Sequence, residues 1–414
     1  MLIPHIKPLL ICRFFLLVFF SLSFHVHADD IVLGMSAAFR GPSKGLGIEL
    51  YRGSMAYFKH VNEGGGINGK KVVIKTYNDG YNPTPAIKNT IDLVTKDNVL
   101  LLFNYVGTPT VTRILPLLKK YSDRDTYLFF PFTGAQPQRE FPYNEYVFNL
   151  RTSYRKETEG LVDNFVRIGK KRIAIFYQAD AYGRSGWDGV KRALSKHKLK
   201  MVGEATYRRG TNYLASLKIQ AEILQKVEPD AIISIGAYEA CAAFIRDARD
   251  EGLNVPIANV SFVGSENLLN LLINTSEETG KDYTKNLVNS QVVPSYEDES
   301  LPAVQQYKHM MEKYNPMPPV AVYDETYKPV KHSFVSFEGF LNAKLLVEII
   351  ARMGANIDKA NIKNVVESIN ELNIGIDTPI SFSSQKHDGL DRVYYTIVSD
   401  NRFVPLTSWE DQIK

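Results

Sequence analysis

The feature that most constrains the fold is the regular alternation of short apolar runs with longer helix-like stretches. Strand-like runs occur at residues 31–35, 72–77, 172–178 and 231–237, and amphipathic stretches such as residues 82–96 lie between them. Several strands, including IAIF and AIISI, are continuously apolar, which is typical of parallel strands covered on both faces. This order predicts an α/β protein built from open parallel sheets with right-handed crossovers.

The first 28 residues have the character of an export signal. Lys7 and Arg13 precede an uncharged, mostly apolar run from Phe14 to Phe24, and a small-residue cleavage site follows just before Asp29. A membrane anchor is the alternative, but a spanning helix needs about 20 apolar residues. We therefore predict a cleaved signal peptide at residues 1–28. The remaining chain is long enough for two lobes at about 100–200 residues per domain.

Composition excludes several classes of protein. The 49 basic and 45 acidic residues are interleaved and give a formal net charge of +4, so neither a nucleic acid nor an acidic membrane surface is predicted as a partner. Cys241 is the only cysteine beyond the signal and stands among alanines, which favours a small buried side chain over a nucleophile. No metal-ligand spacing or catalytic motif is present, so we expect neither a cofactor nor an enzyme.

The stretch NEGGGINGKKVVI at residues 62–74 nearly matches a phosphate-binding loop, but Lys71 stands where a Ser or Thr should follow the Lys. Such a loop needs a strand before it and a helix after it. Here the preceding residues have a helical pattern and the following ones a strand pattern. The glycines therefore more plausibly end a helix and turn the chain, and the nucleotide-binding interpretation fails.

Three loops follow predicted strands of the first half and would meet at one edge of a parallel sheet, where ligands of α/β proteins bind. They contain Arg40 in the first loop, Tyr105, Val106, Gly107 and Thr108 in the second, and Thr133, Gly134 and Ala135 in the third. Thr108 can cap the next helix, whose free N–H groups and positive dipole end suit a carboxylate. For any one loop an ordinary capped turn is the simpler explanation, but three in series favour a ligand site.

The same segments resemble those of the exported solute-binding proteins of the branched-chain amino-acid (Leu/Ile/Val) family. The resemblance covers nearly all of the chain after the signal. It is carried by DIVLGMSAAFRGPSKGLG, NEGGGINGKKV, YNDGYNPTPAIKNT, FYQADAYGRSGWDGV and RDARDEGL in this order. The motifs are loose individually and specific as a series. The resemblance implies the type I periplasmic binding fold, in which two Rossmann-like lobes with parallel sheets are joined by a three-strand hinge and enclose the ligand.

On this resemblance we expect the chain to cross between lobes near Phe148–Arg151, Gln291–Pro294 and Ile380–Phe382. Lobe one is then residues 29–149 plus 294–380, and lobe two is residues 150–292 plus 382–414.

The resemblance also implies roles for individual residues. Gly107 and Thr108 match the position that holds the ligand carboxylate, and Thr133, Gly134 and Ala135 match a second anchoring loop of lobe one. In lobe two, Tyr182 matches the tyrosine of the Y-x-D-x-x-Y-G element, and Ala237 and Tyr238 match a loop that closes over the ligand. Tyr105, Tyr182 and Tyr238 could form the walls of a pocket.

One position departs from the family pattern. Amino-acid-binding members pair the ligand ammonium with an acidic residue where Ser261 stands here. An unpaired buried charge costs about 3–5 kcal/mol, which corresponds to about two to three decades in affinity. Either Glu239 or Glu266 supplies the acid, or the ligand is not an α-amino acid. We favour the second explanation and expect an organic acid, an amide or an aromatic compound.

The function implied is that of a monomeric periplasmic protein that captures a small molecule and delivers it to the permease subunits of an ATP-binding-cassette (ABC) importer. A ligand-sensing module of a membrane receptor or sensor kinase is the alternative, because both partners detect closure of the lobes. A hydrolase on a related fold would need a nucleophile–base pair, and none is visible in the sequence.

Overall fold

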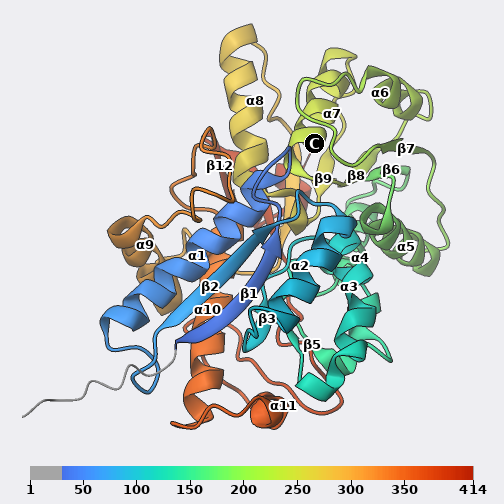
Figure 1. The fold of residues 1–414 in the computed structure, drawn as a ribbon. Helices are drawn as coiled ribbons and strands as arrows, with labels where there is room; N and C mark the ends of the chain where they lie inside the picture. The colour runs from blue at the N-terminus through green and yellow to red at the C-terminus, as the bar shows by residue number, and fades with distance from the viewer. Residues whose placement is uncertain (1–29, 414) are drawn as a thin grey trace, which may run out of the picture.

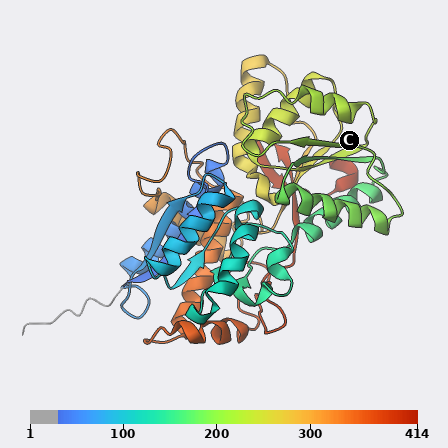
Figure 2. The ribbon, with the colours of Figure 1, turned by 45° about the vertical axis from the view of Figure 1, so that its right-hand side comes forward.

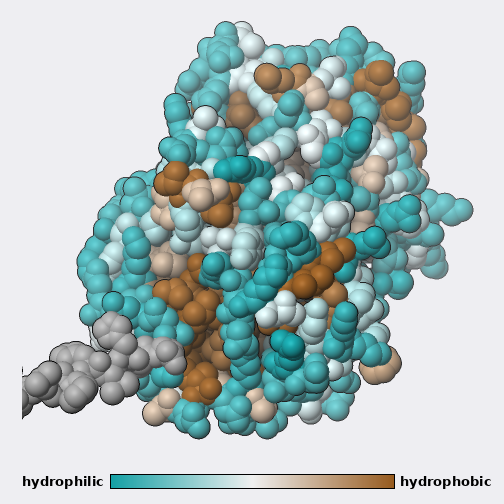
Figure 3. All heavy atoms as spheres, in the orientation of Figure 1, coloured by the Kyte–Doolittle hydropathy of each residue, from teal (hydrophilic) through white to brown (hydrophobic). Residues whose placement is uncertain are grey.

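The computed structural model describes residues 30–413, so the predicted signal peptide at residues 1–28 lies outside the described part. Two α/β lobes are visible, and each is assembled from segments far apart in the sequence (Figures 1 and 2). Across residues 30–413, no helix has the length and apolar character needed to span a membrane. The face shown in Figure 3 is largely hydrophilic, and its apolar side chains lie in separate patches.

Lobe one contains a five-stranded sheet in the order β2-β1-β3-β4-β5, with all neighbours parallel. Its strands are β1 (Ile31–Ala37), β2 (Val72–Asn78), β3 (Leu101–Phe103), β4 (Leu128–Phe129) and β5 (Val147–Phe148). Its helices are α1 (Lys44–Glu63), α2 (Pro83–Thr95), α3 (Thr108–Lys120), α9 (Pro302–Tyr314), α10 (Phe334–Arg352) and α11 (Ile362–Glu367). The last three helices come from the C-terminal part of the chain, so lobe one is discontinuous in sequence.

Lobe two contains a seven-stranded sheet in the order β12-β11-β10-β9-β8-β6-β7. Its strands are β6 (Ile173–Gln178), β7 (Glu204–Tyr207), β8 (Ala231–Ile235), β9 (Ile257–Asn259), β10 (Leu287–Gln291), β11 (Tyr394–Ser399) and β12 (Arg402–Pro405). Its helices are α4 (Tyr154–Arg167), α5 (Ala181–Lys196), α6 (Lys218–Gln225), α7 (Tyr238–Asp250), α8 (Ser265–Thr279) and α12 (Trp409–Gln412). The predicted α/β fold with two parallel-dominated sheets is confirmed, although β11 and β12 add an antiparallel edge.

Small residues allow α1 and α10 to cross closely in lobe one (Figure 1). A Cβ atom on Gly53 would lie 1.7 Å from the carbonyl oxygen of Ser336, so only glycine fits there. The Ser54 hydroxyl donates to the Gly339 carbonyl oxygen at 2.8 Å. The contact places the C-terminal helix α10 against the N-terminal helix α1 and ties the two halves of lobe one together.

The glycine-rich stretch that resembles a phosphate loop lies between a helix and a strand. Helix α1 ends at Glu63 and strand β2 begins at Val72, the reverse of the order that a phosphate loop needs. Gly66 and Gly69 have φ angles of +76° and +81°, which the turn requires. The rejection of a nucleotide-binding loop is therefore confirmed.

The connections between the lobes lie side by side at the end of β5. The N–H groups of Gly389 and Leu390 donate to the carbonyl oxygens of Asn149 and Leu150 at 2.8 and 2.9 Å. Ile380 still pairs with a neighbouring segment of lobe one. This pairing favours a third connection after Leu390, later than the expected Ile380–Phe382, and the residue limits of the two lobes remain a prediction.

Candidate functional site

Two of the predicted loops of lobe one join at the start of helix α3. Val106 forms a parallel bridge with Phe132, and the Gly107 N–H donates to the Phe132 carbonyl oxygen at 3.1 Å. The hydroxyl groups of Thr108 and Thr133 lie 2.6 Å apart. Helix α3 begins immediately after Gly107, so the two hydroxyls lie at the positive end of its dipole. The loops therefore form one polar surface suited to an anionic or carbonyl oxygen.

Residues of lobe two cover this surface from the other side. Asp180 caps helix α5 by accepting the Tyr182 N–H at 2.9 Å, and this cap fixes Tyr182 in the first turn. The Tyr182 ring lies 4.6 Å from that of Phe262, centroid to centroid. The Tyr238 hydroxyl accepts the N–H of Gly45, a residue of lobe one, at 3.2 Å. The two lobes are thus closed on each other.

Five rings fill the space between the lobes, and we call them the aromatic cluster. Its members are Tyr81 and Phe132 from lobe one and Tyr154, Tyr182 and Phe262 from lobe two. Phe262 touches both lobe-one rings, with centroid distances of 5.9 Å to Tyr81 and 5.3 Å to Phe132. All five side chains are buried. A ligand that binds between the lobes must therefore meet these rings.

Four polar residues lie beside the rings, and we call them the charged cluster: Arg151, Glu157, Ser261 and Glu338. The Arg151 guanidinium donates to the Ser261 hydroxyl, and its Nε lies 3.5 Å from a Glu338 oxygen. Glu157 accepts the N–H of Ser261 at 2.8 Å and its hydroxyl at 3.1 Å. The Arg151 guanidinium also lies 4.3 Å from the centroid of the Phe132 ring, so the two clusters are in contact.

Some hydrogen-bond donors of the charged cluster have no acceptor. Among the described residues, Nε and Nη1 of Arg151 make no hydrogen bond although the side chain is buried. Burial raises the pKa of the Glu338 carboxyl to about 7, and the nearby Arg151 opposes that rise. Unpaired buried donors are costly, so a ligand oxygen placed there would be favourable.

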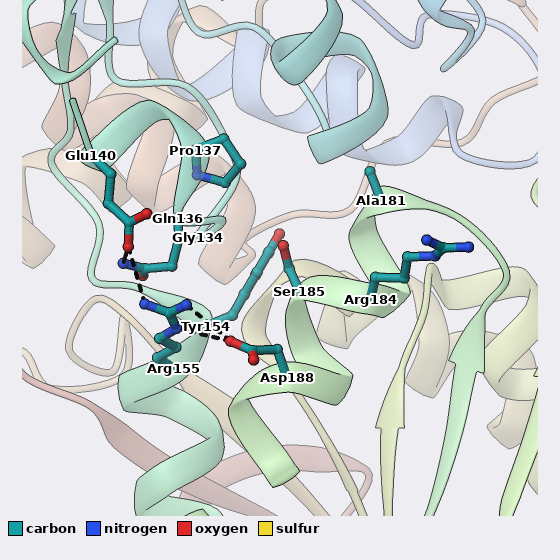
Figure 4. A pocket seen from close by; sticks show the side chains of 10 residues that line it. All are labelled: Gly134, Gln136, Pro137, Glu140, Tyr154, Arg155, Ala181, Arg184, Ser185 and Asp188. Atoms are coloured by element: carbon teal, nitrogen blue, oxygen red, sulfur yellow. Dashed lines mark hydrogen bonds and ion pairs between the residues drawn. The ribbon is translucent and has the colours of Figure 1, made fainter. Parts of the chain in front are cut away.

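A cavity of about 390 Å³ opens beside the clusters, between the two lobes (Figure 4). Its lining residues are Gly134, Gln136, Pro137 and Glu140 from lobe one and Tyr154, Arg155, Ala181, Arg184, Ser185 and Asp188 from lobe two. Arg155 crosses it and forms ion pairs with Glu140 at 3.1 Å and Asp188 at 3.0 Å. Gly134, a residue of the predicted second anchoring loop, therefore also lines a cavity that solvent or ligand can enter.

The structure brings most of the predicted site residues together, and their roles as ligand contacts remain predictions. The group at the lobe interface contains Val106, Gly107, Thr108, Thr133, Gly134, Ala135, Tyr182, Ala237, Tyr238 and Ser261. Two predicted residues do not join it. The Tyr105 hydroxyl lies 3.1 Å from that of Thr90, in the separate core beneath α2 and α3. Arg40 is exposed and donates to the Ala321 carbonyl oxygen.

Neither acid considered as a replacement for the family's acidic residue contacts Ser261. Glu239 accepts the Tyr213 N–H, and Glu266 accepts the Phe334 N–H. The acid that does contact Ser261 is Glu157, from the first turn of α4, which sequence reasoning missed.

Sequence reasoning also missed Tyr81 and Arg151. Arg151 follows the end of β5, so the strand-end rule that identified the other loops could have found it. Tyr81 stands in the turn after β2, where the same rule applies. Cys241 is buried as predicted, and within residues 30–413 no group of three or more potential metal-ligating side chains is found.

The sequence of this chain is similar to those of known proteins. Residues 30–402 match the family model described as periplasmic binding protein. The chain is 23% identical over 284 residues to the Leu/Ile/Val-binding protein homolog 3 of Brucella melitensis, an alignment that covers 66% of this chain and 74% of that protein.

Solved structures show the same fold. The crystal structure of a possible leucine/isoleucine/valine-binding protein from Rhodopirellula baltica matches with a TM-score of 0.83 and 29% identity, covering 95% of this chain and all of that one. A branched-chain amino acid ABC transporter structure from Thermus thermophilus with bound valine matches with a TM-score of 0.77 at 18% identity, covering 92% and 96% of the two chains. The relatives are binding proteins and not enzymes, which agrees with the lack of a catalytic motif.

Proposed function

This chain belongs to the periplasmic binding protein family, and from that premise we propose that it captures a small organic ligand between its lobes and delivers it to the permease subunits of an ABC importer. One observation carries the proposal: the anchoring loops of lobe one, joined at the start of α3, meet lobe two through the contact of the Phe132 and Phe262 rings in a closed interface. A protein that closes around its ligand in this way can present a distinct closed surface to a partner.

We further propose that the ligand carries a carboxylate or amide oxygen and lacks an α-ammonium group. The buried Arg151 has N–H groups without acceptors, whereas the acid beside Ser261, Glu157, already accepts both polar hydrogens of that serine. An added ammonium group would lie near a guanidinium and would be repelled. The protein would act as a periplasmic monomer exported through its signal peptide.

The test is calorimetric titration with a panel of carboxylic acids, amides, leucine and valine. An acid or amide should bind at micromolar or lower concentration. Thr108→Val should weaken its binding by about ten- to hundredfold, because one hydrogen bond to an ionised oxygen is worth about 1.5–3 kcal/mol. Thr112→Val is the matched control, since the Thr112 hydroxyl bonds only to backbone carbonyls of the same helix.

Two outcomes would contradict the proposal. Micromolar binding of leucine or valine, with no acid or amide bound, would overturn the ligand class. A small-angle X-ray scattering profile that the true ligand leaves unchanged, measured from an open ligand-free state, would overturn the closing mechanism.

A further inference from the structure

Arg155, in the first turn of α4, reaches across the interlobe cavity and contacts an acid on each side (Figure 4). Its guanidinium lies 3.1 Å from a Glu140 oxygen of lobe one and 3.0 Å from an Asp188 oxygen of lobe two. The side chain is partly exposed, so a solute in the cavity can reach it. A guanidinium has five N–H donors, and these two contacts leave some of them for another acceptor.

Each of the two acids has a second donor besides Arg155. The Gln136 amide donates to a Glu140 oxygen at 3.2 Å. The Arg192 guanidinium donates to the two oxygens of Asp188 at 3.0 and 2.8 Å. Loss of an ion pair is costly mainly when it leaves a charge without a partner. Arg155 can therefore turn from these acids to a ligand anion while both carboxylates keep a hydrogen bond.

The charges around the cavity do not cancel. The lining residues include two cations, Arg155 and Arg184, and two acids, Glu140 and Asp188. Arg192 adds a third cation through its contact with Asp188, so the local charge is 3 − 2 = +1. The Arg184 guanidinium is exposed, extends away from Arg155 in Figure 4, and forms no ion pair with the residues that the structure describes. One ligand carboxylate in the cavity would balance this excess charge.

The cavity borders the anchoring loops of lobe one. Gly134, the neighbour of Thr133, lines it, and the Tyr154 N–H donates to the Gly134 carbonyl oxygen at 2.7 Å. Arg155 directly follows Tyr154, so the hydrogen bond that joins the lobes here also places Arg155 beside the loop. Arg151 of the charged cluster stands just before the same helix. The far end of a ligand that is anchored at the Thr133 loop can therefore extend into the cavity.

We propose, on the basis of the proposed function, that the ligand is a dicarboxylate whose second carboxylate binds Arg155 in this cavity. The anchoring loops and Arg151 hold the first carboxylate. The second carboxylate accepts the remaining N–H donors of Arg155 and neutralises the excess positive charge. A planar guanidinium can bind both oxygens of a carboxylate at once, and a methyl end group offers no acceptor at all. Arg155 thereby distinguishes a diacid from the monoacid of equal length.

The test is calorimetry with pairs of diacids and monoacids at about pH 8, where all carboxyl groups of the probes are ionised. The probes are glutarate, adipate and suberate, each compared with pentanoate, hexanoate or octanoate of the same chain length. The wild type should bind at least one diacid about tenfold or more tightly than its monoacid, because the second carboxylate adds charge-assisted hydrogen bonds.

Arg155→Gln should lose this preference. Its affinity for the preferred diacid should fall about tenfold, whereas its affinity for the paired monoacid should stay within about threefold of the wild type, because the ion pairs of Arg155 are partly exposed. Arg155→Lys keeps the charge and should retain part of the preference. Lys156→Gln is the matched control, since this neighbour in α4 pairs with Asp391 and does not line the cavity. Thermal unfolding checks that each variant is folded.

The outcomes distinguish failure of the dicarboxylate assignment from failure of the proposed function. Equal affinity of the wild type for each diacid and its monoacid would overturn the assignment and leave capture of a monoacid or amide standing. Equal losses for diacid and monoacid in Arg155→Gln, or a preference that this variant keeps, would overturn the role of Arg155 in recognition. No binding of any of the three diacids would also overturn the assignment, and the wider panel of acids and amides would then test the proposed function by itself.

Discussion

The aromatic cluster and the charged cluster both lie between the lobes, but different forces hold them. Pairs of rings such as Tyr81 and Phe262 contribute about 0.5–1.5 kcal/mol beyond the area they bury. Removing one partner of a buried ion pair such as Arg151 and Glu338 costs about 3–5 kcal/mol, because a buried charge is left unpaired. We therefore expect the rings to tolerate the loss of one partner better than the charged cluster, which lies beside the connection after β5.

The largest effect should come from Arg151→Leu. The variant leaves Glu157 and Glu338 buried without their cation, and we expect the free energy of unfolding to fall by about 3–5 kcal/mol in urea denaturation. Arg155→Ala removes a partly exposed arginine with two ion pairs and should cost less than about 1 kcal/mol. Equal losses of unfolding free energy in the two variants would show that burial of the Arg151 charge does not set the size of the effect.

A smaller effect should come from pH. Burial raises the pKa of Glu338 from its ordinary value of 4.5 to about 7. The unfolded state therefore loses this proton at a lower pH than the folded state. The contribution of Glu338 to stability is fully present below about pH 4.5 and is lost as the pH rises through 7. The groups that face the carboxyl are Arg151, Glu157 and Arg139.

The measurement is chemical denaturation between pH 5 and 8. Over this range, titration of Glu338 should lower the free energy of unfolding by on the order of 2 kcal/mol. Glu338→Gln should remove this part of the dependence of stability on pH. Burial also raises the pKa values of Asp79 and Glu266 to about 7, so these two carboxyls should still make stability depend on pH in the variant. A slope unchanged in Glu338→Gln would contradict this assignment.

The smallest effect should come from Phe262→Leu, which keeps most of the buried volume but loses the ring contacts with Tyr81, Phe132 and Tyr182. The free energy of unfolding should fall by about 1 kcal/mol. Closure should nevertheless become less favourable, so that a higher ligand concentration is needed to compact the protein in X-ray scattering. Phe244→Leu, a buried ring wholly within lobe two, is the control for a loss of stability without opening.

The fold could be predicted because its signal is local. Continuously apolar strands and amphipathic helices alternate, and their period determines the class of fold. The antiparallel edge formed by β11 and β12 could not be predicted in the same way. A strand's direction depends on which distant strand it pairs with, and β11 pairs with β10 from a position about a hundred residues later in the chain.

In the candidate site, too, some features follow from local sequence and others depend on distant contacts. Val106 and Tyr105 are neighbours at one strand end, but Val106 joins the lobe interface and Tyr105 joins the core under α2 and α3. Successive side chains of an extended chain point to opposite faces, so an error of one position changes the role completely. Arg151, Glu157, Ser261 and Glu338 come from three separate segments of the chain, and no local pattern places Glu338 beside Arg151.

The close crossing of α1 and α10 has a consequence for biosynthesis. A nascent chain that has reached only residue 330 has made all of the first sheet but lacks α10, so one side of α1 has no partner. The second sheet likewise waits for residues 394–405 before β10 loses its open edge. Neither half can complete its core while the ribosome is still translating the last fifth of the chain. Completion of the two hydrophobic cores therefore follows synthesis of α10 and of the β11–β12 edge.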